Sequence, residues 1–336
     1  MSSRYQQSGR AMLAGAAAIL CLLIPVAATA QTRLFNNQAF LQAPNAEVGV
    51  RPNGAFGSTS VPAGYHSNTG ACLGFIVSRN SNGWGAGAQI DGDFFCPGNP
   101  TEIWSLTVNG ATAFNTENAT GIPGTLGGLV VGPPTHSVTW TSNAPFNGVA
   151  ISQTYSLSHT DQTLRMSVTV TNTTGAAING VQFARVVDPD NATSPGQFTS
   201  TDLVVSQAPA QVTASFTTGA LIALSSSHPR ATAGYQLTRG GSPFTAAAII
   251  AENGWETTPG STHTADSYIG LAVDIGTLAA GASETFTLSY PLTEQAAEEE
   301  AAPAVVPTMT EWAMILLGLM LAGGAALTIQ GRRASV

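Results

Sequence analysis

The sequence contains no lysine, so all 11 of its basic residues are arginines. Charged residues make up only 9% of the 336 residues, against about 25% in an average soluble domain. Without its two ends, the chain has 7 basic and 18 acidic residues and a net charge of −11. Such a charge repels phosphate backbones, so we do not expect nucleic-acid binding.

Short catalytic motifs are also missing. The chain has no G-x-S-x-G, no H-E-x-x-H and no phosphate-binding glycine loop. Its five histidines are scattered, and the nearest pairing with a carboxylate, His159 with Asp161, falls between two expected strands and is typical of a solvated turn. On these grounds we expect a protein that is not an enzyme.

Cysteine is scarce, with three residues in the whole chain. Cys21 lies in the N-terminal apolar stretch, which leaves Cys72 and Cys96 in the body of the protein. If the protein is exported, we expect a disulfide that contributes about 3 kcal/mol by closing a loop. Two buried, unpaired thiols are the alternative, and the spacing does not suit zinc.

The N-terminus carries the three parts of a secretory signal peptide. Arg4 and Arg10 precede an apolar run, and the small residues Ala28 and Ala30 follow it. We therefore expect residues 1–30 to be removed by cleavage after Ala30. Lipid attachment at Cys21 is disfavoured because Leu20 stands where a small residue is needed.

A second apolar stretch, Trp312 to Ile329, lies near the C-terminus. As a helix it reaches about 27 Å, which just spans a hydrocarbon core of about 30 Å. Arg332 and Arg333 follow it and should stay in the cytoplasm, so the body of the protein should lie outside. A core helix of a soluble domain would show a polar face, and this stretch has none.

The last residues, "VPTMTEWAMILLGLMLAGGAALTIQGRR", resemble the IPTL-CTERM sorting signals of bacterial envelope proteins, relatives of the PEP-CTERM signals. The residues of the motif are Val306, Pro307, Thr308, Met309, Glu311 and Trp312, where Val306 and Met309 replace the usual Ile and Leu. The resemblance implies that residues 306–336 are a sorting signal. It also implies that a membrane-embedded, exosortase-like enzyme recognises this tail and passes the body of the protein to the cell surface.

Between the ends, residues 31–292 read as a folded ectodomain and residues 293–305 as an acidic, alanine- and proline-containing spacer. Alternating apolar residues predict strands at Gly148–Ser158, Thr163–Asn172 and Glu284–Tyr290. Glycine- and asparagine-rich turns separate them, and no amphipathic helical stripe of useful length is present. The sequence therefore predicts an all-β fold, an antiparallel β-sandwich in one large or two smaller units.

Two further resemblances are limited to fold and compartment. The segments "RMSVTVTNTTGAAINGVQF" and "IGTLAAGASETFTLSYPL" are similar to strand units of immunoglobulin-like domains in bacterial surface proteins. The stretch "NGWGAGAQIDGDFFCPGNPTEIWSLTVNG", with "RVVDPDNA" later in the chain, resembles uncharacterised secreted proteins with large β-sandwich ectodomains.

Two short acidic clusters are candidate calcium ligands. "DPDN" supplies Asp188, Asp190 and Asn191, and "DGDFF" covers Asp91–Phe95. Calcium takes six to eight oxygen ligands, and Asp-x-Asp turns often provide them. The same residue types also form tight turns for backbone reasons alone, and the EF-hand spacing is absent.

These features favour an exported, surface-sorted structural or adhesive protein that contacts extracellular polysaccharide or matrix. The alternative is a secreted carbohydrate-binding module or carbohydrate-active enzyme, with Asp188 and Asp190 near a cleft that Trp104 lines. Carboxylates that converge in space would favour this alternative.

Overall fold

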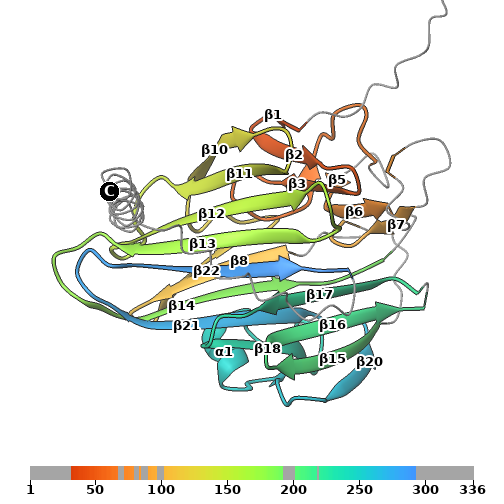
Figure 1. Cartoon of the computed structure of the whole chain (residues 1–336). Coiled ribbons are helices and arrows are strands. Elements are labelled where there is room, and N and C mark those ends of the chain that lie inside the picture. The colour runs from red at the N-terminus through yellow and green to blue at the C-terminus, as the bar shows by residue number, and fades with distance from the viewer. Residues whose placement is uncertain are drawn as a thin grey trace, which may run out of the picture.

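Antiparallel sheets make up nearly all of the computed structural model, which describes residues 32–66, 72–78, 83–84, 90–96, 102–191, 201–217 and 219–292 (Figure 1). Their strands form sheets of nine, six, five and two strands. This architecture confirms the predicted all-β sandwich class.

The largest sheet has nine strands, and its order along the sheet differs from their order in the chain. From edge to edge they are β10 (Gly124–Val130), β11 (Thr135–Ser142), β12 (Val149–Ser158), β13 (Leu164–Asn172), β22 (Ser283–Tyr290), β17 (Leu221–Ser226), β16 (Ala210–Phe216), β15 (Thr201–Gln207) and β20 (Thr262–Ala265). In β12 and β16 every second side chain is buried, as the sequence alternation predicts for strands with one face against the core.

The second large sheet has six strands and packs face to face against the first. Its order is β19 (Trp255–Glu256), β18 (Ala231–Gln236), β21 (Ile269–Leu278), β14 (Ile178–Val187), β8 (Glu102–Val108) and β9 (Ala111–Asn115). The ring of Trp104 in β8 lies 5.1 Å from that of Trp140 in β11. Phe183 in β14 lies 5.5 Å from Phe286 in β22. Large aromatic rings therefore fill the space between the two sheets.

The two segments that resemble immunoglobulin-like strand units connect the two large sheets. β13 and β22 belong to the nine-stranded sheet, whereas β14 and β21 belong to the six-stranded sheet. The side chain of Asn172, at the end of β13, is buried and donates to the backbone oxygens of Ala176, Leu278 and Ala279. These hydrogen bonds link the connection between β13 and β14 to the connection between β21 and β22.

The N-terminal part forms the smaller sheets. The five-stranded sheet has the order β1 (Arg33–Phe35), β2 (Gln38–Gln42), β3 (Ala46–Val50), β6 (Phe75–Ser78) and β7 (Ile90–Asp93), and the two-stranded sheet pairs β4 (Ser58–Thr59) with β5 (Cys72–Leu73). A disulfide joins Cys72 to Cys96, with a Cα–Cα distance of 6.1 Å, which is compatible with the expected bridge.

The only helix among the described residues is α1 (Ala246–Ile250), whose N-cap Thr245 accepts a hydrogen bond from the backbone of Ala248. It packs on the outer face of the six-stranded sheet, where Ile249 joins a cluster with Ala184 and Val186. The second half of β14 is consequently buried on both faces, which the side-chain alternation of a half-exposed strand does not predict.

The two ends of the chain lie outside the described residues. The signal peptide (1–30), the spacer (293–305) and the sorting signal with its expected span at 312–329 fall there. In the part that the structure describes, no helix is both long and apolar enough to cross a membrane.

Candidate acid–base site

Three strands of the six-stranded sheet bring a set of acidic residues together at one end of that sheet. Asp188 and Asp190 follow β14 directly, and Asp266 lies just before β21. The end of β14 adjoins the start of β21, because Val187 pairs with Ile269. Tyr235 of β18 pairs with the same Ile269, so the segment after β18, which carries Arg239, reaches the same place.

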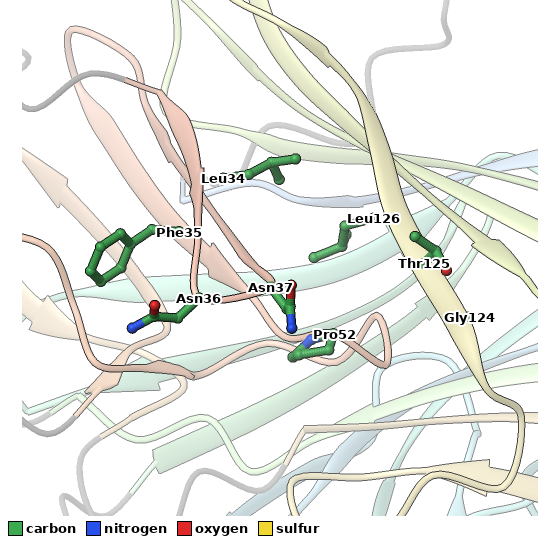
Figure 2. Close-up of a pocket in the computed structure, with 8 residues that line it drawn as sticks. All are labelled: Leu34, Phe35, Asn36, Asn37, Pro52, Gly124, Thr125 and Leu126. Atoms are coloured by element: carbon green, nitrogen blue, oxygen red, sulfur yellow. The ribbon is translucent and has the colours of Figure 1, made fainter.

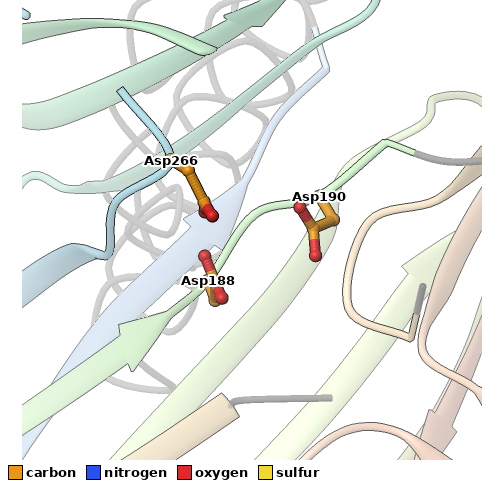
Figure 3. A group of neighbouring side chains, drawn as sticks. All are labelled: Asp188, Asp190 and Asp266. Atoms are coloured by element: carbon orange, nitrogen blue, oxygen red, sulfur yellow. The ribbon is translucent and has the colours of Figure 1, made fainter. Parts of the chain in front are cut away.

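The carboxylate oxygens of Asp188, Asp190 and Asp266 lie within 4.8 Å of one another. Figure 3 shows that Asp188 and Asp266 face each other from different segments, with Asp190 beside them on the segment that follows β14. Asp188 and Asp190 are each only 4% exposed, whereas Asp266 is exposed. We call these three residues the acidic cluster.

Arg239 provides the positive charge of this site. Its Nη2 donates to Oδ2 of Asp188, and its Nη1 donates to Oδ2 of Asp266 at 2.9 Å. The guanidinium lies 5.8 Å from the ring centre of Tyr268, and Tyr268 packs against Phe244 at 4.8 Å. The acidic cluster is therefore bordered by one arginine and a pair of aromatic rings.

Burial changes the proton affinity of the two inner carboxyl groups. It raises the pKa of Asp188 to about 6, while Arg239 opposes the rise and Asp266 adds to it. Burial also raises the pKa of Asp190 to about 7, with further increases from the negative charges of Asp188 and Asp266. Between these pKa values Asp190 is therefore protonated more often than Asp188, so one group can act as an acid and the other as a base.

The same oxygens could hold a hard cation such as calcium. Asn191, the third residue of the expected ligand set, is buried next to Asp190 in the chain. Arg239 already neutralises part of the negative charge, so a bound cation would have to displace its guanidinium from Asp188 or Asp266.

The other residues that the sequence singled out have structural surroundings. Asp93 of the "DGDFF" segment is fully buried, and its carboxylate accepts hydrogen bonds from the backbone N–H groups of Gly74, Phe75 and Phe95. The alternative hypothesis placed Trp104 near a cleft with Asp188 and Asp190. Its side chain is instead completely buried in the core, because β8 is covered on both faces. Trp140 and Trp255 are buried as well.

Asp161 and His159 lie apart from the acidic cluster in the fold. Asp161 pairs with Arg165 at 2.8 Å, and His159 contacts His136 through their Nε2 atoms at 2.8 Å. Sequence reasoning missed Asp266 and Arg239, which are more than 45 residues from Asp188 in the chain and carry no local motif. Only the strand order places them beside Asp188.

Comparison with known proteins gives similarity to solved structures alone. No protein-family model matches the chain, and no curated protein is similar to it. A bacterial glucoamylase in complex with acarbose is similar over 77% of this chain, with 9% identity and a TM-score of 0.40, and the match covers only 31% of that enzyme.

Two smaller proteins are matched over nearly their whole length. A putative aldose 1-epimerase from Escherichia coli K12 has 12% identity over 76% of this chain and 98% of its own, with a TM-score of 0.39. A galactose mutarotase-like protein from Lactobacillus casei has 11% identity over 76% of this chain and 100% of its own, with a TM-score of 0.38.

These neighbours contradict the expectation that the chain is not an enzyme, since glucoamylase and the putative aldose 1-epimerase carry enzyme names. The expectation was based on missing short motifs. Such motifs reveal only catalytic residues that are close in the chain, whereas the acidic cluster is assembled from segments that are distant in the chain. The activities in the printed names belong to those proteins.

Proposed function

We propose that this chain is a carbohydrate-active protein that uses Asp188 and Asp190 to transfer a proton to and from a sugar oxygen. The observation that carries the proposal is the pair of neighbouring carboxyl groups whose pKa values are raised to about 6 and about 7. A side chain transfers protons most efficiently when its pKa is close to the working pH.

The environments of the two carboxyl groups suggest their roles. Asp190 has the higher pKa and no ion pair with Arg239 among the contacts of the described residues, so it is the proposed acid. Asp188 is held by Arg239 and has the lower pKa, so it is the proposed base. Asp188 and Asp190 each have a carboxylate oxygen within 4.8 Å of one on the other, so both can reach the same sugar oxygen.

Tyr268 supports carbohydrate as the substrate class. Its half-buried ring lies beside Arg239 and against Phe244. An aromatic face next to hydrogen-bonding charged groups can receive the C–H face of a sugar while the hydroxyl groups are bound at its edge. Among the described residues we find no feature that favours the structural or adhesive role, and we do not pursue that hypothesis.

The test measures catalysis on simple sugars and on short chains. The purified protein is incubated with the α-anomers of glucose and galactose and with a panel of neutral oligosaccharides, and NMR follows anomer interconversion and new reducing ends. Asp190→Asn should reduce the rate at least about 100-fold, since general acid catalysis contributes that much.

Asp161→Asn is the matched control, because Asp161 is a half-exposed carboxylate in the loop between β12 and β13. It should leave the rate unchanged. A wild-type protein that changes none of these sugars, or an Asp190→Asn variant with the full rate, would reject the proposal.

Calcium binding by Asp188, Asp190 and Asn191 is a second candidate, favoured by the three converging carboxylates of the acidic cluster. Calorimetric titration with calcium chloride should then give heat that Asp188→Asn abolishes, and the melting temperature should rise with calcium concentration. Absence of both effects would leave the acid–base role alone.

Export and sorting belong to the same proposal and rest on residues 1–30 and 306–336 of the sequence. We propose that an exosortase-like enzyme processes the tail and releases the protein from the membrane to the surface. Mass spectrometry of envelope-derived protein should then find no peptide beyond Met320. Intact tails throughout would instead indicate a permanently membrane-bound protein.

A further inference from the structure

A groove of about 550 Å³ lies between the β1–β2 hairpin and the edge strand β10 (Figure 2). Leu34, Asn37 and Leu126 converge on the space between these two elements, and Pro52 lies along its floor. A second hollow of about 300 Å³ shares Pro52 and Gly124 with the first. The two hollows are therefore neighbours, and we call them together the edge groove.

The first part of the edge groove offers apolar surface. Leu34 and Phe35 are 44% and 41% exposed. Seven large hydrophobic residues are exposed in the described part of the chain, and four of them, Leu34, Phe35, Val130 and Val131, lie on β1 or at the end of β10. Exposed apolar residues that line a hollow, as Leu34 and Phe35 do, are typical of a binding surface.

Two asparagines stand beside this apolar surface, in the turn between β1 and β2. Asn36 and Asn37 have φ angles of +49° and +58°, so the turn itself favours asparagine or glycine. Glycine would satisfy the backbone equally well. Asparagine additionally carries an amide group with donors and an acceptor, and Figure 2 shows the amide of Asn37 on the groove side of the hairpin, whereas that of Asn36 points away from β10.

The second part of the edge groove is polar and held in a fixed shape. Arg51 donates to the backbone oxygens of Phe56 and Glu117 at 3.1 and 3.2 Å. The amide of Asn53 donates to the backbone oxygens of Thr116 and Ala119. Hydrogen bonds from both Arg51 and Asn53 therefore hold the loop that carries Glu117 in place.

Glu117 has an oxygen that lacks a hydrogen-bond donor. Its Oε1 accepts from the amide of Asn118 at 3.1 Å, whereas its Oε2 is shielded from solvent and accepts no hydrogen bond from any described residue. A shielded carboxylate oxygen without a donor is costly. Glu117 lines the second hollow, so a turn of its carboxylate toward that hollow would let a ligand hydroxyl group donate to it and would remove the cost.

We propose that the edge groove binds a neutral oligosaccharide. One sugar hydroxyl can donate to Glu117 and another can accept from the amide of Asn37, and the exposed side chain of Leu34 suits the C–H surface of a pyranose ring. Glu117 and the net charge of −8 disfavour an anionic glycan. The groove and the acidic cluster are separate: β10 is one edge of the nine-stranded sheet, and β20, which precedes Asp266, is the other edge.

The choice of a carbohydrate ligand rests on the proposed function. Binding in the edge groove does not, however, require any catalysis by the acidic cluster. The probes are the hexasaccharides of β-1,4-glucan, α-1,4-glucan and β-1,4-xylan, with hexagalacturonate as the charged comparison. Binding of each to the full-length protein in detergent is measured by calorimetry and by NMR shift perturbation.

Two variants are expected to keep the fold. Asn37→Gly removes an amide and keeps the left-handed turn, and Glu117→Gln is isosteric and removes the acceptor charge. At least one neutral hexasaccharide should bind to the wild type. Each variant should weaken its binding at least about fivefold, the effect of losing one hydrogen bond to a ligand. Melting temperatures should stay within about two degrees of the wild type.

Asp161→Asn, the control in the loop between β12 and β13, should bind the same hexasaccharide with unchanged affinity. If Asp190→Asn keeps full catalytic activity while the groove variants lose binding, the proposed function fails and the groove stands. The groove proposal itself is overturned if no neutral hexasaccharide binds at millimolar concentration. It is equally overturned if hexagalacturonate binds best, or if both groove variants bind like the wild type.

Discussion

Arg185 of β14 and Glu102 of β8 form an ion pair whose side chains are both completely buried between the two large sheets. The guanidinium donates from Nε to Oε1 at 2.5 Å and from Nη2 to Oε2 at 3.0 Å. It also donates to Oε1 of Gln153 and to the backbone oxygen of Gly54. The Cζ atom of Arg185 lies 4.3 Å from the centre of the Phe56 ring. The guanidinium therefore has hydrogen-bond acceptors along its edge and an aromatic ring against its face.

This pair gives a prediction about stability. Glu102→Gln should lower the free energy of unfolding by about 3–5 kcal/mol, because it leaves the charge of Arg185 buried without a counterion. The double variant Glu102→Gln with Arg185→Met should recover part of that loss, since it removes the unpaired charge. Urea unfolding followed by tryptophan fluorescence measures both.

The exposed pair of Asp161 and Arg165 is the comparison for this experiment. Each side chain is more than a third exposed, so Asp161→Asn should cost less than about 1 kcal/mol. Equal losses for Glu102→Gln and Asp161→Asn would show that the buried pair contributes no more to stability than the exposed one.

The raised pKa of Asp190 predicts that stability depends on pH in a defined direction. In the unfolded chain the group titrates near its ordinary value of 3.8, and in the folded protein its pKa is about 7. The folded state therefore binds more protons between these values, and the free energy of unfolding should fall as the pH rises from about 4 to about 7.

Asp190→Asn removes this dependence, and at pH 8 it should stabilise the protein by about 1–2 kcal/mol relative to the wild type, with a smaller difference at pH 4. Thermal unfolding at the two pH values measures the change. A variant that is destabilised more at pH 8 than at pH 4 would contradict the raised pKa.

The disulfide between Cys72 and Cys96 closes a loop across a sequence separation of 24 residues. Replacing both cysteines by serine should lower the free energy of unfolding by about 3 kcal/mol, because the unfolded chain gains conformational freedom. The reduced wild type should behave like the variant. Full alkylation of both thiols before reduction would show that the bridge is absent from the isolated protein.

Much of the fold follows from local sequence pattern, whereas the site does not. Alternation places β12 and β13 within one residue of their bounds, because each strand has one buried and one exposed face. Alternation does not predict β8 and the end of β14, because both are covered on both faces. Asp188 and Asp190 are visible as a local cluster. Asp266 and Arg239 join them only through the pairing of β14, β21 and β18, which no local pattern contains.

The contact between His136 and His159 gives the last prediction. Their Nε2 atoms are 2.8 Å apart, and Nδ1 of His136 accepts from the backbone N–H of Gly132 at 3.2 Å. A neutral His136 with its proton on Nε2 satisfies both contacts, since it donates to His159. A second proton on the pair would have no acceptor there.

Burial lowers the pKa of His136, and the neighbouring His159 lowers it further. The folded state therefore binds fewer protons than the unfolded chain below about pH 6.5, and the stability from this pair should be lost as the pH falls through that region. His136→Gln should destabilise the protein at pH 7.5 and have a smaller effect at pH 5. Imidazole proton shifts in NMR should show His136 titrating at lower pH than a free histidine, and an ordinary or raised titration point would refute this account.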